Sequence, residues 1–396
     1  MALAINIIRQ NGNIPTALPG EDHISGLMFY IADADLPIAA DGVTDGFSTT
    51  NRIISISTPE RAVALGLSRD AEKWIHRVIY YHISECLRMG NGVSLYVGLF
   101  AEQQIYDFTE VKTMQNFTDG RLRQIGVWCG DRELAQADLT ALQAAATVLE
   151  AQMHPLSIIY QPKIVSLSAL SNLRGNNQKN VSITIGQDGG GTGADLYAND
   201  NSGSASVGVI GCIIGAIAKA KVNECIAWGE KFPTGLSLAA FGNGQLLRNT
   251  DKATTEQFDT YGYIYLNNRD GQTGVYFSDS QTMDTATSDY NAIERERTMD
   301  KAVRGVIANL SLKTGMPLKL DAETGKLASN VVASLKNAAG QAIEQMERDG
   351  ELSGFAVEID PEQNVLATGK VEFLVKNVPM GVMRLAEVKI GYYETV

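Results

Sequence analysis

The sequence near the C-terminus reads Arg384-Leu385-Ala386-Glu387-Val388-Lys389-Ile390-Gly391-Tyr392-Tyr393. In an extended chain, one side of this segment carries Ala386, Val388, Ile390 and Tyr392. The other side carries Leu385, Glu387, Lys389 and Gly391 and is mostly polar. This period of two is typical of a half-buried strand. Chain ends usually fray unless something holds them, so we expect this strand to pair with an exposed sheet edge, in the same subunit or in a neighbour.

The N-terminal segment has the same extended character. It reads Leu3-Ala4-Ile5-Asn6-Ile7-Ile8-Arg9, and Gly12 and Pro15 follow it. We therefore expect Ile5 and Ile7 to belong to a second terminal arm. A strand at each end, with long helices between them, favours a polymer over a solitary enzyme.

Length and composition indicate a multidomain globular protein. The 396 residues are too many for one typical core, so two or three domains are expected. Hydrophobic residues make up 44% and charged residues 20%, which is ordinary for a folded protein. The net charge of −12 argues against direct binding of nucleic acid, because phosphate contacts require clustered Lys and Arg.

The cysteines predict buried free thiols rather than a metal site. Cys86, Cys129, Cys212 and Cys225 lack the Cys-x-x-Cys spacing of a zinc site and mostly have apolar neighbours. This usage suits a reducing compartment. The N-terminus lacks the basic and apolar regions of a secretory signal. The most apolar stretch, 207–218, falls short of the ~20 residues of a membrane span, so it predicts a buried helix and no membrane insertion.

Strand and helix patterns alternate through the first half of the chain. Expected strands cover 25–32, 52–57, 93–100, 124–129 and 156–160, and expected helices cover 70–89, 108–117 and 131–153. This alternation favours an α/β layer with a largely parallel sheet. The run Thr58-Pro59-Glu60-Arg61 has the marks of a helix start. A strand at 181–185 and a buried helix at 205–220 are expected further on.

The last third changes to an α+β pattern. Short strands at 263–266 and 274–277 flank Asn267-Asn268-Arg269-Asp270-Gly271, which favours a hairpin. Long helices are expected at 288–312 and 326–348. Strands at 355–359 and 370–375, together with the terminal strand, could complete a sheet.

A glycine-rich run offers an alternative function. Gly186-Gln187-Asp188-Gly189-Gly190-Gly191-Thr192-Gly193-Ala194 follows a strand and partly fits a dinucleotide-binding fingerprint. That fingerprint requires a helix to open at once at the pyrophosphate, whereas 195–203 has the composition of a loop. The lysine of a phosphate-binding P-loop is also missing. We expect 186–203 to be a mobile surface loop, and a nucleotide-binding enzyme using 186–194 is the alternative.

The remaining polar residues predict no catalytic or metal site. His76 and His82 lie six apart on one helix and do not project to one point, so we expect His82 in the core and His76 on the surface. Asp33 and Asp35, with Asp41 nearby, could suggest calcium, but Pro37 and Ile38 do not fit an EF-hand loop. The chain contains no Gly-x-Ser-x-Gly nucleophile motif.

The helix expected at 326–348 is one-sided. Its apolar stripe runs through Leu327, Val331, Leu335, Ala338, Ala342 and Met346, which indicates packing against a sheet. The other face carries Asn330, Asn337, Gln341 and Glu344. This polar face is either solvated or meets a partner.

In combination, these features resemble contractile tail sheath proteins of phages and related injection systems. The similar parts are the helix, glycine turn and strand of 70–100, the stretch Val209-Ile210-Gly211-Cys212-Ile213-Ile214-Gly215-Ala216 leading to Ala227-Trp228, the segment Gly274-Val275-Tyr276-Phe277-Ser278-Asp279-Ser280, the two late helices and the strand-ended tail. The resemblance covers most of the chain and is strongest from Gln257 onward.

The resemblance implies an architecture and a set of partners. It implies an N-terminal arm at 1–24, an outer α/β domain at 25–255, an inner domain at 256–380 and a C-terminal arm at 381–396. Arm residues would be Ile5, Ile7, Leu385, Val388, Ile390 and Tyr392, and the helix with Asn330, Asn337, Gln341 and Glu344 would face an inner tube. Subunits would stack as hexameric rings around that tube, with baseplate and tail terminator proteins as further partners.

The resemblance also implies contraction without catalysis. An extended, metastable sheath would contract by rearranging its subunits while the arms keep them connected. No cofactor is expected. The protein would assemble in the host cytoplasm and end in a virion tail or an injection particle. A non-contractile capsid or tube-like protein is a third possibility.

Overall fold

The computed structural model describes residues 20–199 and 205–392, which form two compact units. Unit 1 takes in the described residues up to Val222 together with Ile226–Arg297. Unit 2 takes in Asn223–Cys225 and the described residues from Thr298 onward. The expected boundary after residue 255 lies inside unit 1, because 256–297 packs with the earlier part of the chain. The outer and inner places of the units in an assembly stay a prediction.

A six-stranded sheet forms the centre of unit 1, in the order β2-β3-β1-β4-β5-β6. Its strands are β1 (Ser25–Ile31), β2 (Ile53–Ile56), β3 (Leu95–Ala101), β4 (Gln124–Glu133), β5 (Ser157–Lys163) and β6 (Val181–Ile183). All neighbours pair in parallel except β2, which pairs antiparallel with β3. The predicted α/β fold with a largely parallel sheet is therefore confirmed.

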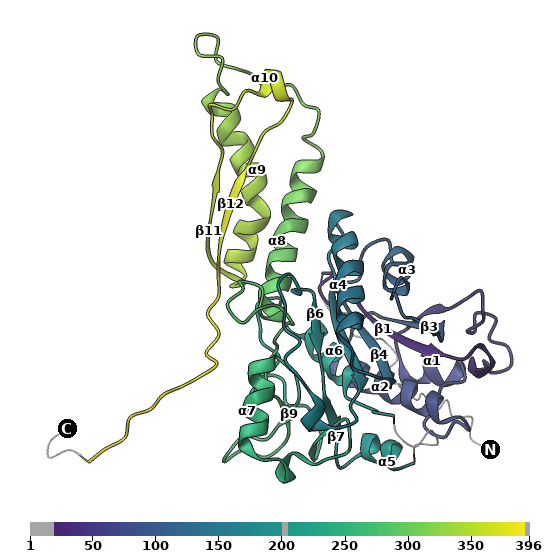
Figure 1. Ribbon diagram of the computed structural model, residues 1–396. Helices are drawn as coiled ribbons and strands as arrows, with labels where there is room; N and C mark the ends of the chain where they lie inside the picture. Colours follow the sequence, from purple (N-terminus) through teal and green to yellow (C-terminus); the bar gives the residue numbers. More distant parts are fainter. Residues whose placement is uncertain (1–19, 200–204, 393–396) are drawn as a thin grey trace, which may run out of the picture. The chain divides into compact units, whose positions relative to one another are not determined.

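Helices cover both faces of this sheet (Figure 1). One face packs on α1 (Pro59–Ala64), α2 (Trp74–Gly90) and α6 (Ile210–Lys219), and the other on α3 (Glu110–Phe117) and α4 (Gln136–Ala151). The side chains of the central strand β1 point alternately to the two faces. Phe29 belongs to the apolar core on the side of α2 and α6, whereas Met28 and Tyr30 belong to the core on the side of α3 and α4. A strand that is buried on both faces is the expected centre of a three-layer fold.

Helix α6 crosses α2 at very short range through two glycines. A Cβ atom on Gly211 would lie 2.1 Å from the carbonyl oxygen of His82, and one on Gly215 would lie 2.6 Å from that of Cys86. The two glycines are four residues apart and so share one face of α6. Their missing side chains let the two backbones approach.

The helix start predicted at Thr58 is confirmed, because its side-chain oxygen accepts a hydrogen bond from the Arg61 amide at 3.2 Å. We expect Thr58→Ala to lower the free energy of unfolding of unit 1 by about 1 kcal/mol, the usual value of a lost N-cap. Thr58→Ser keeps the acceptor and should be nearly neutral. Urea denaturation of the two variants measures the difference, and equal stability would show that the cap contributes nothing.

Smaller elements complete unit 1. Strands β7 (Gly186–Asp188) and β8 (Ala239–Phe241) pair antiparallel, as do β9 (Leu266–Asn267) and β10 (Tyr276–Phe277). The latter pair confirms the predicted hairpin. Helices α5 (Thr192–Ala198) and α7 (Lys252–Tyr261) lie between these strands in sequence, and short 3-10 turns cover Asp33–Asp35, Leu167–Ala169 and Leu247–Asn249.

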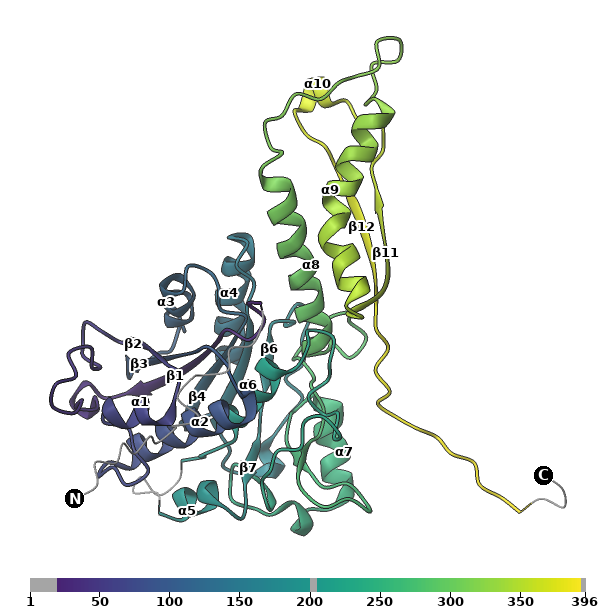
Figure 2. The same ribbon diagram turned by 180° about the vertical axis from the view of Figure 1, so that it is seen from behind.

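Unit 2 is an α+β structure with little core. Helix α8 (Ile293–Ser311) starts in unit 1 and continues into unit 2, where α9 (Ser329–Arg348), α10 (Val365–Thr368), β11 (Leu352–Glu358) and β12 (Leu374–Pro379) follow. Figure 2 shows β11 and β12 side by side along α9. Ile343, Met346 and Leu352 belong to one small apolar cluster, and Leu327, Leu335 and Ile359 belong to another.

Several predicted boundaries are wrong for identifiable reasons. Helix α4 begins at Gln136 rather than at 131, because 131–133 continue strand β4. Helix α6 begins at Ile210 rather than at 205, because the Ser206 amide donates to the carbonyl of Gly130 at 2.7 Å and holds the chain extended. Among the helices described, none combines the length and apolar character needed to cross a membrane.

Candidate subunit-joining surface

The two strands of unit 2 form a sheet that ends after one pair. Strands β11 and β12 are antiparallel, and within the described residues no further strand joins them. A two-stranded sheet alone is marginally stable in water. Its outer edges carry backbone groups that can pair with another chain. Packing on α9 supports this sheet, and its edges are open to pairing with an additional strand.

A groove of 840 Å³ runs beside β11 and over α9. Phe355, Ala356 and Val357 of β11 line one side, and Asn337, Ala338, Gly340, Gln341 and Glu344 of α9 line the other. A Cβ atom on Gly340 would lie 3.2 Å from the Phe355 ring, so the glycine lets this ring settle on the helix. The β11 side of the groove is thus apolar, and the α9 side carries the polar residues Asn337, Gln341 and Glu344.

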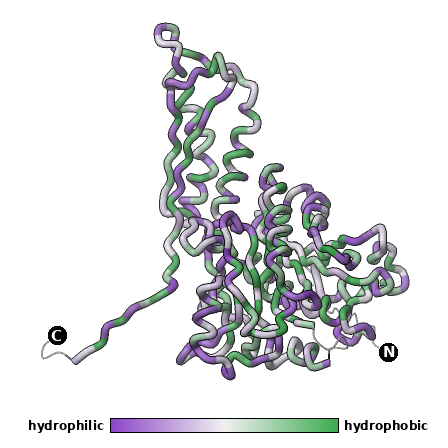
Figure 3. The backbone as a smooth tube through the Cα atoms, viewed as in Figure 1, coloured by the Kyte–Doolittle hydropathy of each residue, from purple (hydrophilic) through white to green (hydrophobic). Residues whose placement is uncertain are grey.

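The C-terminal tail that follows β12 pairs with no strand among the described residues. The described tail, 381–392, has no regular secondary structure, and its large apolar side chains are open to solvent: Met383, Leu385, Val388, Ile390 and Tyr392. Ile390 is 92% exposed and Tyr392 is fully exposed. Figure 3 shows hydrophobic and hydrophilic stretches along this tail. Contiguous exposed apolar side chains mark interaction sites.

The predicted arm residues have two different outcomes. Ile5 and Ile7 lie outside the described residues. Leu385, Val388, Ile390 and Tyr392 lie in the exposed tail rather than in a strand. The expectation that the terminal strand completes a sheet within the same subunit is therefore wrong for 385–392, and its pairing with a neighbour stays a prediction.

The predicted tube-facing residues all lie exposed on α9: Asn330, Asn337, Gln341 and Glu344. Asn337, Gln341 and Glu344 line the groove beside β11, whereas Asn330 does not. Glu344 is paired with Arg348, one turn further on. Asn337, Gln341 and Glu344 therefore lie on one side of the groove, where a tube or an incoming strand could contact them.

The predicted apolar stripe of this helix is wrong in part. Leu335 and Met346 are buried as expected, but Ala338 and Ala342 are only half-buried. Ala339, Gly340 and Ile343 take their place in the buried face. The sequence analysis also missed the groove, whose one local signal is Gly340, a residue that weakens a helix unless a neighbour needs the space.

The expectation of a mobile loop at 186–203 is wrong for its described part. Strand β7 is buried, and Gln187 accepts hydrogen bonds from the amides of Val207 and Gly208 at 2.9 and 3.2 Å. Helix α5 opens at Thr192. The Asp188 carboxylate accepts from the amides of Gly190 and Gly193 at 3.1 and 3.3 Å.

These contacts remove support for nucleotide binding. Asp188 is 2% exposed and supplies the negative charge that a phosphate would bring to the glycine amides. A phosphate at the same place would meet a buried carboxylate. The alternative of a nucleotide-binding enzyme at 186–194 is therefore not supported.

The other polar residues singled out in the sequence have structural partners. His82 is buried as predicted, its Nε2 lies 2.9 Å from the Val207 carbonyl, and burial lowers its pKa to about 3. His76 is buried too, contrary to expectation, because its Nε2 contacts the Asp35 carbonyl at 2.6 Å. Asp33 and Asp35 pair with Arg52 and Lys73 at 2.6 and 2.7 Å.

The four cysteines are buried thiols, as predicted, and none of them forms a disulfide within the described residues. Burial raises the pKa of Cys86 and Cys212, so these thiols stay protonated at neutral pH. A protonated thiol is a poor nucleophile and a poor metal ligand. Their role is packing.

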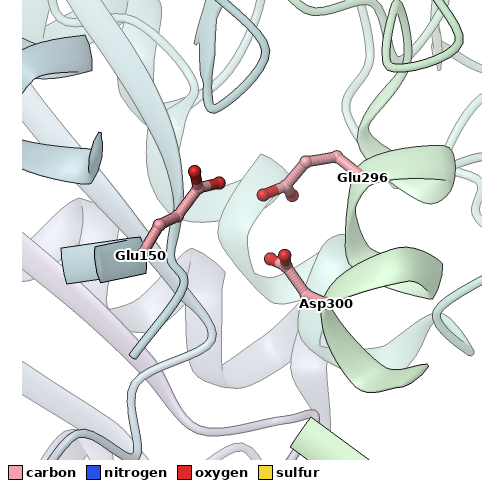
Figure 4. A group of neighbouring side chains, drawn as sticks. All are labelled: Glu150, Glu296 and Asp300. Atoms are coloured by element: carbon pink, nitrogen blue, oxygen red, sulfur yellow. The ribbon is translucent and has the colours of Figure 1, made fainter. Parts of the chain in front are cut away.

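Three carboxylates near the base of α8 are shown in Figure 4. Glu150 binds Lys179 and Asn180, each at 2.9 Å. Glu296 accepts hydrogen bonds from Ser157 and, at 2.8 Å, from Asn180. Asp300 lies one turn beyond Glu296 on α8 and belongs to unit 2. Protein donors already occupy Glu150 and Glu296, so we assign no metal site.

Two family models match almost the whole described chain. The model described as DUF2586, N-terminal domain, matches residues 40–281, and the model described as DUF2586, C-terminal domain, matches residues 289–395. The chain belongs to the DUF2586 family. The gap between the two matches, 282–288, lies close to the point where unit 1 ends.

Solved structures similar to this DUF2586 protein come from contractile particles. A chain of the anti-feeding prophage (AFP) baseplate has a TM-score of 0.65 at 11% identity and covers 98% of each chain. A chain of the contracted AFP helical sheath has a TM-score of 0.60 at 12% sequence identity, and the match covers 100% of this chain and 99% of that chain.

The contracted sheath of an extracellular contractile injection system, PVC, gives a TM-score of 0.59 at 10% identity and covers 100% of this chain and 99% of that one. These likenesses establish that the protein has the fold found in these assemblies, as the sequence resemblance implied. No curated protein matches the sequence significantly.

Proposed function

We propose that this DUF2586 protein is a non-enzymatic subunit of a contractile sheath. One observation carries the proposal: the same unit holds a two-stranded sheet with open edges and an exposed tail with a strand pattern. A tail of one copy can add a strand to the sheet of a second copy, whose own tail can join a third, and this head-to-tail arrangement builds a polymer. The sheath fold of the whole chain supports this reading.

In the proposed assembly, unit 2 is the inner part and unit 1 the outer part. Stacked hexameric rings surround an inner tube, and baseplate and tail terminator proteins close the two ends. The rings assemble in the host cytoplasm and end in a phage tail or an injection particle. Contraction rearranges the rings and drives the tube through a target envelope, with the arms keeping the rings connected.

Electron microscopy of the purified protein with and without its tube tests this proposal. We expect helical tubes of one diameter that convert to a wider, shorter form. A protein that stays monomeric at high concentration, with the tube present, would contradict the proposal.

A more specific prediction concerns the polar face of α9. We expect Glu344→Lys to weaken tube-templated assembly, because it reverses a charge on an exposed face and breaks the pair with Arg348. Folding should survive, since exposed substitutions usually change the stability by less than about 0.5 kcal/mol. Sedimentation with the tube measures assembly.

Asn330→Lys is the matched comparison, because Asn330 is exposed on α9 outside the groove. If the tube contacts the whole polar face, both variants should weaken templated assembly. If only the groove wall is used, Glu344→Lys alone should act, and it should also reduce assembly without a tube. Normal assembly of both variants would exclude this face as a contact.

A further inference from the structure

Unit 1 contains a pocket of 260 Å³ between α2 and α5. Arg77, Tyr81 and Glu85 of α2 line it, together with Asp195 of α5 and with Arg69 and Asp70, which precede α2 in the chain. The proposed arms and the groove of unit 2 do not use this pocket.

Two polar atoms in the pocket wall have no hydrogen-bond partner among the described residues. They are the hydroxyl of Tyr81 and Nε of Arg77. Tyr81 is only 5% exposed. Buried polar groups are nearly always hydrogen-bonded, so these two donors, one helical turn apart on α2, leave hydrogen-bonding capacity for a bound acceptor.

The charges of the pocket point to the kind of acceptor. Glu85 is already paired with Arg88 at 2.5 Å. Arg69 and Arg77, by contrast, have no ion pair within the described part of the chain. The planar guanidinium group of arginine matches a carboxylate through two parallel hydrogen bonds.

We propose that this pocket binds a carboxylate group, held by Arg77 and Arg69 with the Tyr81 hydroxyl as a further donor. Asp70 and Asp195 are exposed at the same pocket and limit its positive charge, so a singly charged carboxylate fits better than a doubly charged phosphate. Burial, with a smaller effect of Asp188, raises the pKa of Tyr81 well above its usual value and keeps the phenol a donor. The proposal rests on unit 1 alone and is independent of the proposed sheath function.

Saturation-transfer NMR of propionate with the full-length protein tests the pocket. We expect binding in the millimolar range, which suits a small anion held by few contacts. Arg77→Gln should weaken it by about tenfold or more, the effect of one charged hydrogen bond. Arg248→Gln is the matched control, since Arg248 is an exposed arginine of the same unit outside the pocket. It should bind propionate as the native protein does.

Tyr81→Phe separates binding from folding. It should weaken propionate binding several-fold and leave the melting temperature unchanged, because the lost hydroxyl has no partner in the fold. A clear drop in the melting temperature would show that the hydroxyl is engaged elsewhere and would contradict the proposal. Absence of propionate binding, or equal binding by the Arg77→Gln variant, would overturn it.

The same variants identify the source of the carboxylate. A free small acid should bind without any effect on polymerisation. An acidic side chain of a second copy should instead make polymerisation sensitive both to Arg77→Gln and to added propionate. Either result supports the pocket, and a failure to polymerise at all leaves the propionate titration as an independent test.

Discussion

Deletion of 381–396 should yield folded, soluble subunits that no longer polymerise. The described tail packs on no strand and exposes its apolar side chains, so its loss removes little from the fold. In an assembly, the same tail would bury Val388, Ile390 and Tyr392, each worth about 1.5–3 kcal/mol, and form new backbone hydrogen bonds. Losing these contacts should raise the critical concentration for polymerisation by at least about 100-fold.

Point variants make the same test without truncation. Val388→Asp and Ile390→Asp place charges on the apolar side of the tail, whereas Glu387→Gln and Lys389→Gln alter only its polar side. We expect the first pair to abolish polymers seen by light scattering and the second pair to polymerise normally. Normal sheaths from the truncated protein would refute the tail as a joining arm.

The layered fold of unit 1 was predictable because its strands are apolar runs separated by helical patterns. Strand β1 shows this well, since its side chains alternate between two cores and neither side of the strand is polar. The start of α4 was misjudged because Asp131 and Glu133 resemble the acidic first turn of a helix, whereas pairing of Glu133 with Lys163 extends the strand.

Long-range hydrogen bonds account for the larger errors. The start of the glycine-rich run, Gly186–Asp188, is a buried strand whose Gln187 accepts hydrogen bonds from the amides of Val207 and Gly208, and no local pattern predicts such distant partners. His76 is buried by the carbonyl of Asp35, a residue 41 positions away in the sequence. These are tertiary effects that override local propensity.

The candidate site was predictable only in outline. The alternation of apolar and polar residues in the tail predicted a strand that pairs with another sheet. The polar residues on one face of α9 predicted an exposed surface that could contact a partner. The groove itself depends on how α9 lies on β11, which places Gly340 against Phe355. Helix periodicity fixes a face only to within about one residue, and here the buried face centres on Ala339 and Ile343 rather than on Ala338 and Ala342.

Gly211→Ala should strongly destabilise unit 1. The new methyl group would lie 2.1 Å from the carbonyl oxygen of His82, and backbone atoms cannot turn aside as a side chain can. Alanine favours a helix over glycine by about 1 kcal/mol, so the substitution would be mildly stabilising on an exposed helix. Forcing α6 away from α2 costs more, because overpacking alone costs about 1–3 kcal/mol and the displaced helix also leaves voids in the core.

We therefore expect a net loss of about 3 kcal/mol, which corresponds to a fall of roughly 6–12 °C in the melting temperature of a unit of this size. Gly175→Ala is the matched control, because its new methyl group would meet only the flexible side chain of Gln178 at 3.3 Å. Calorimetry of both variants measures the difference. Equal melting temperatures would mean that the helices can separate without cost. The expected result would instead show that the missing side chain at Gly211 sets how closely α6 packs on α2.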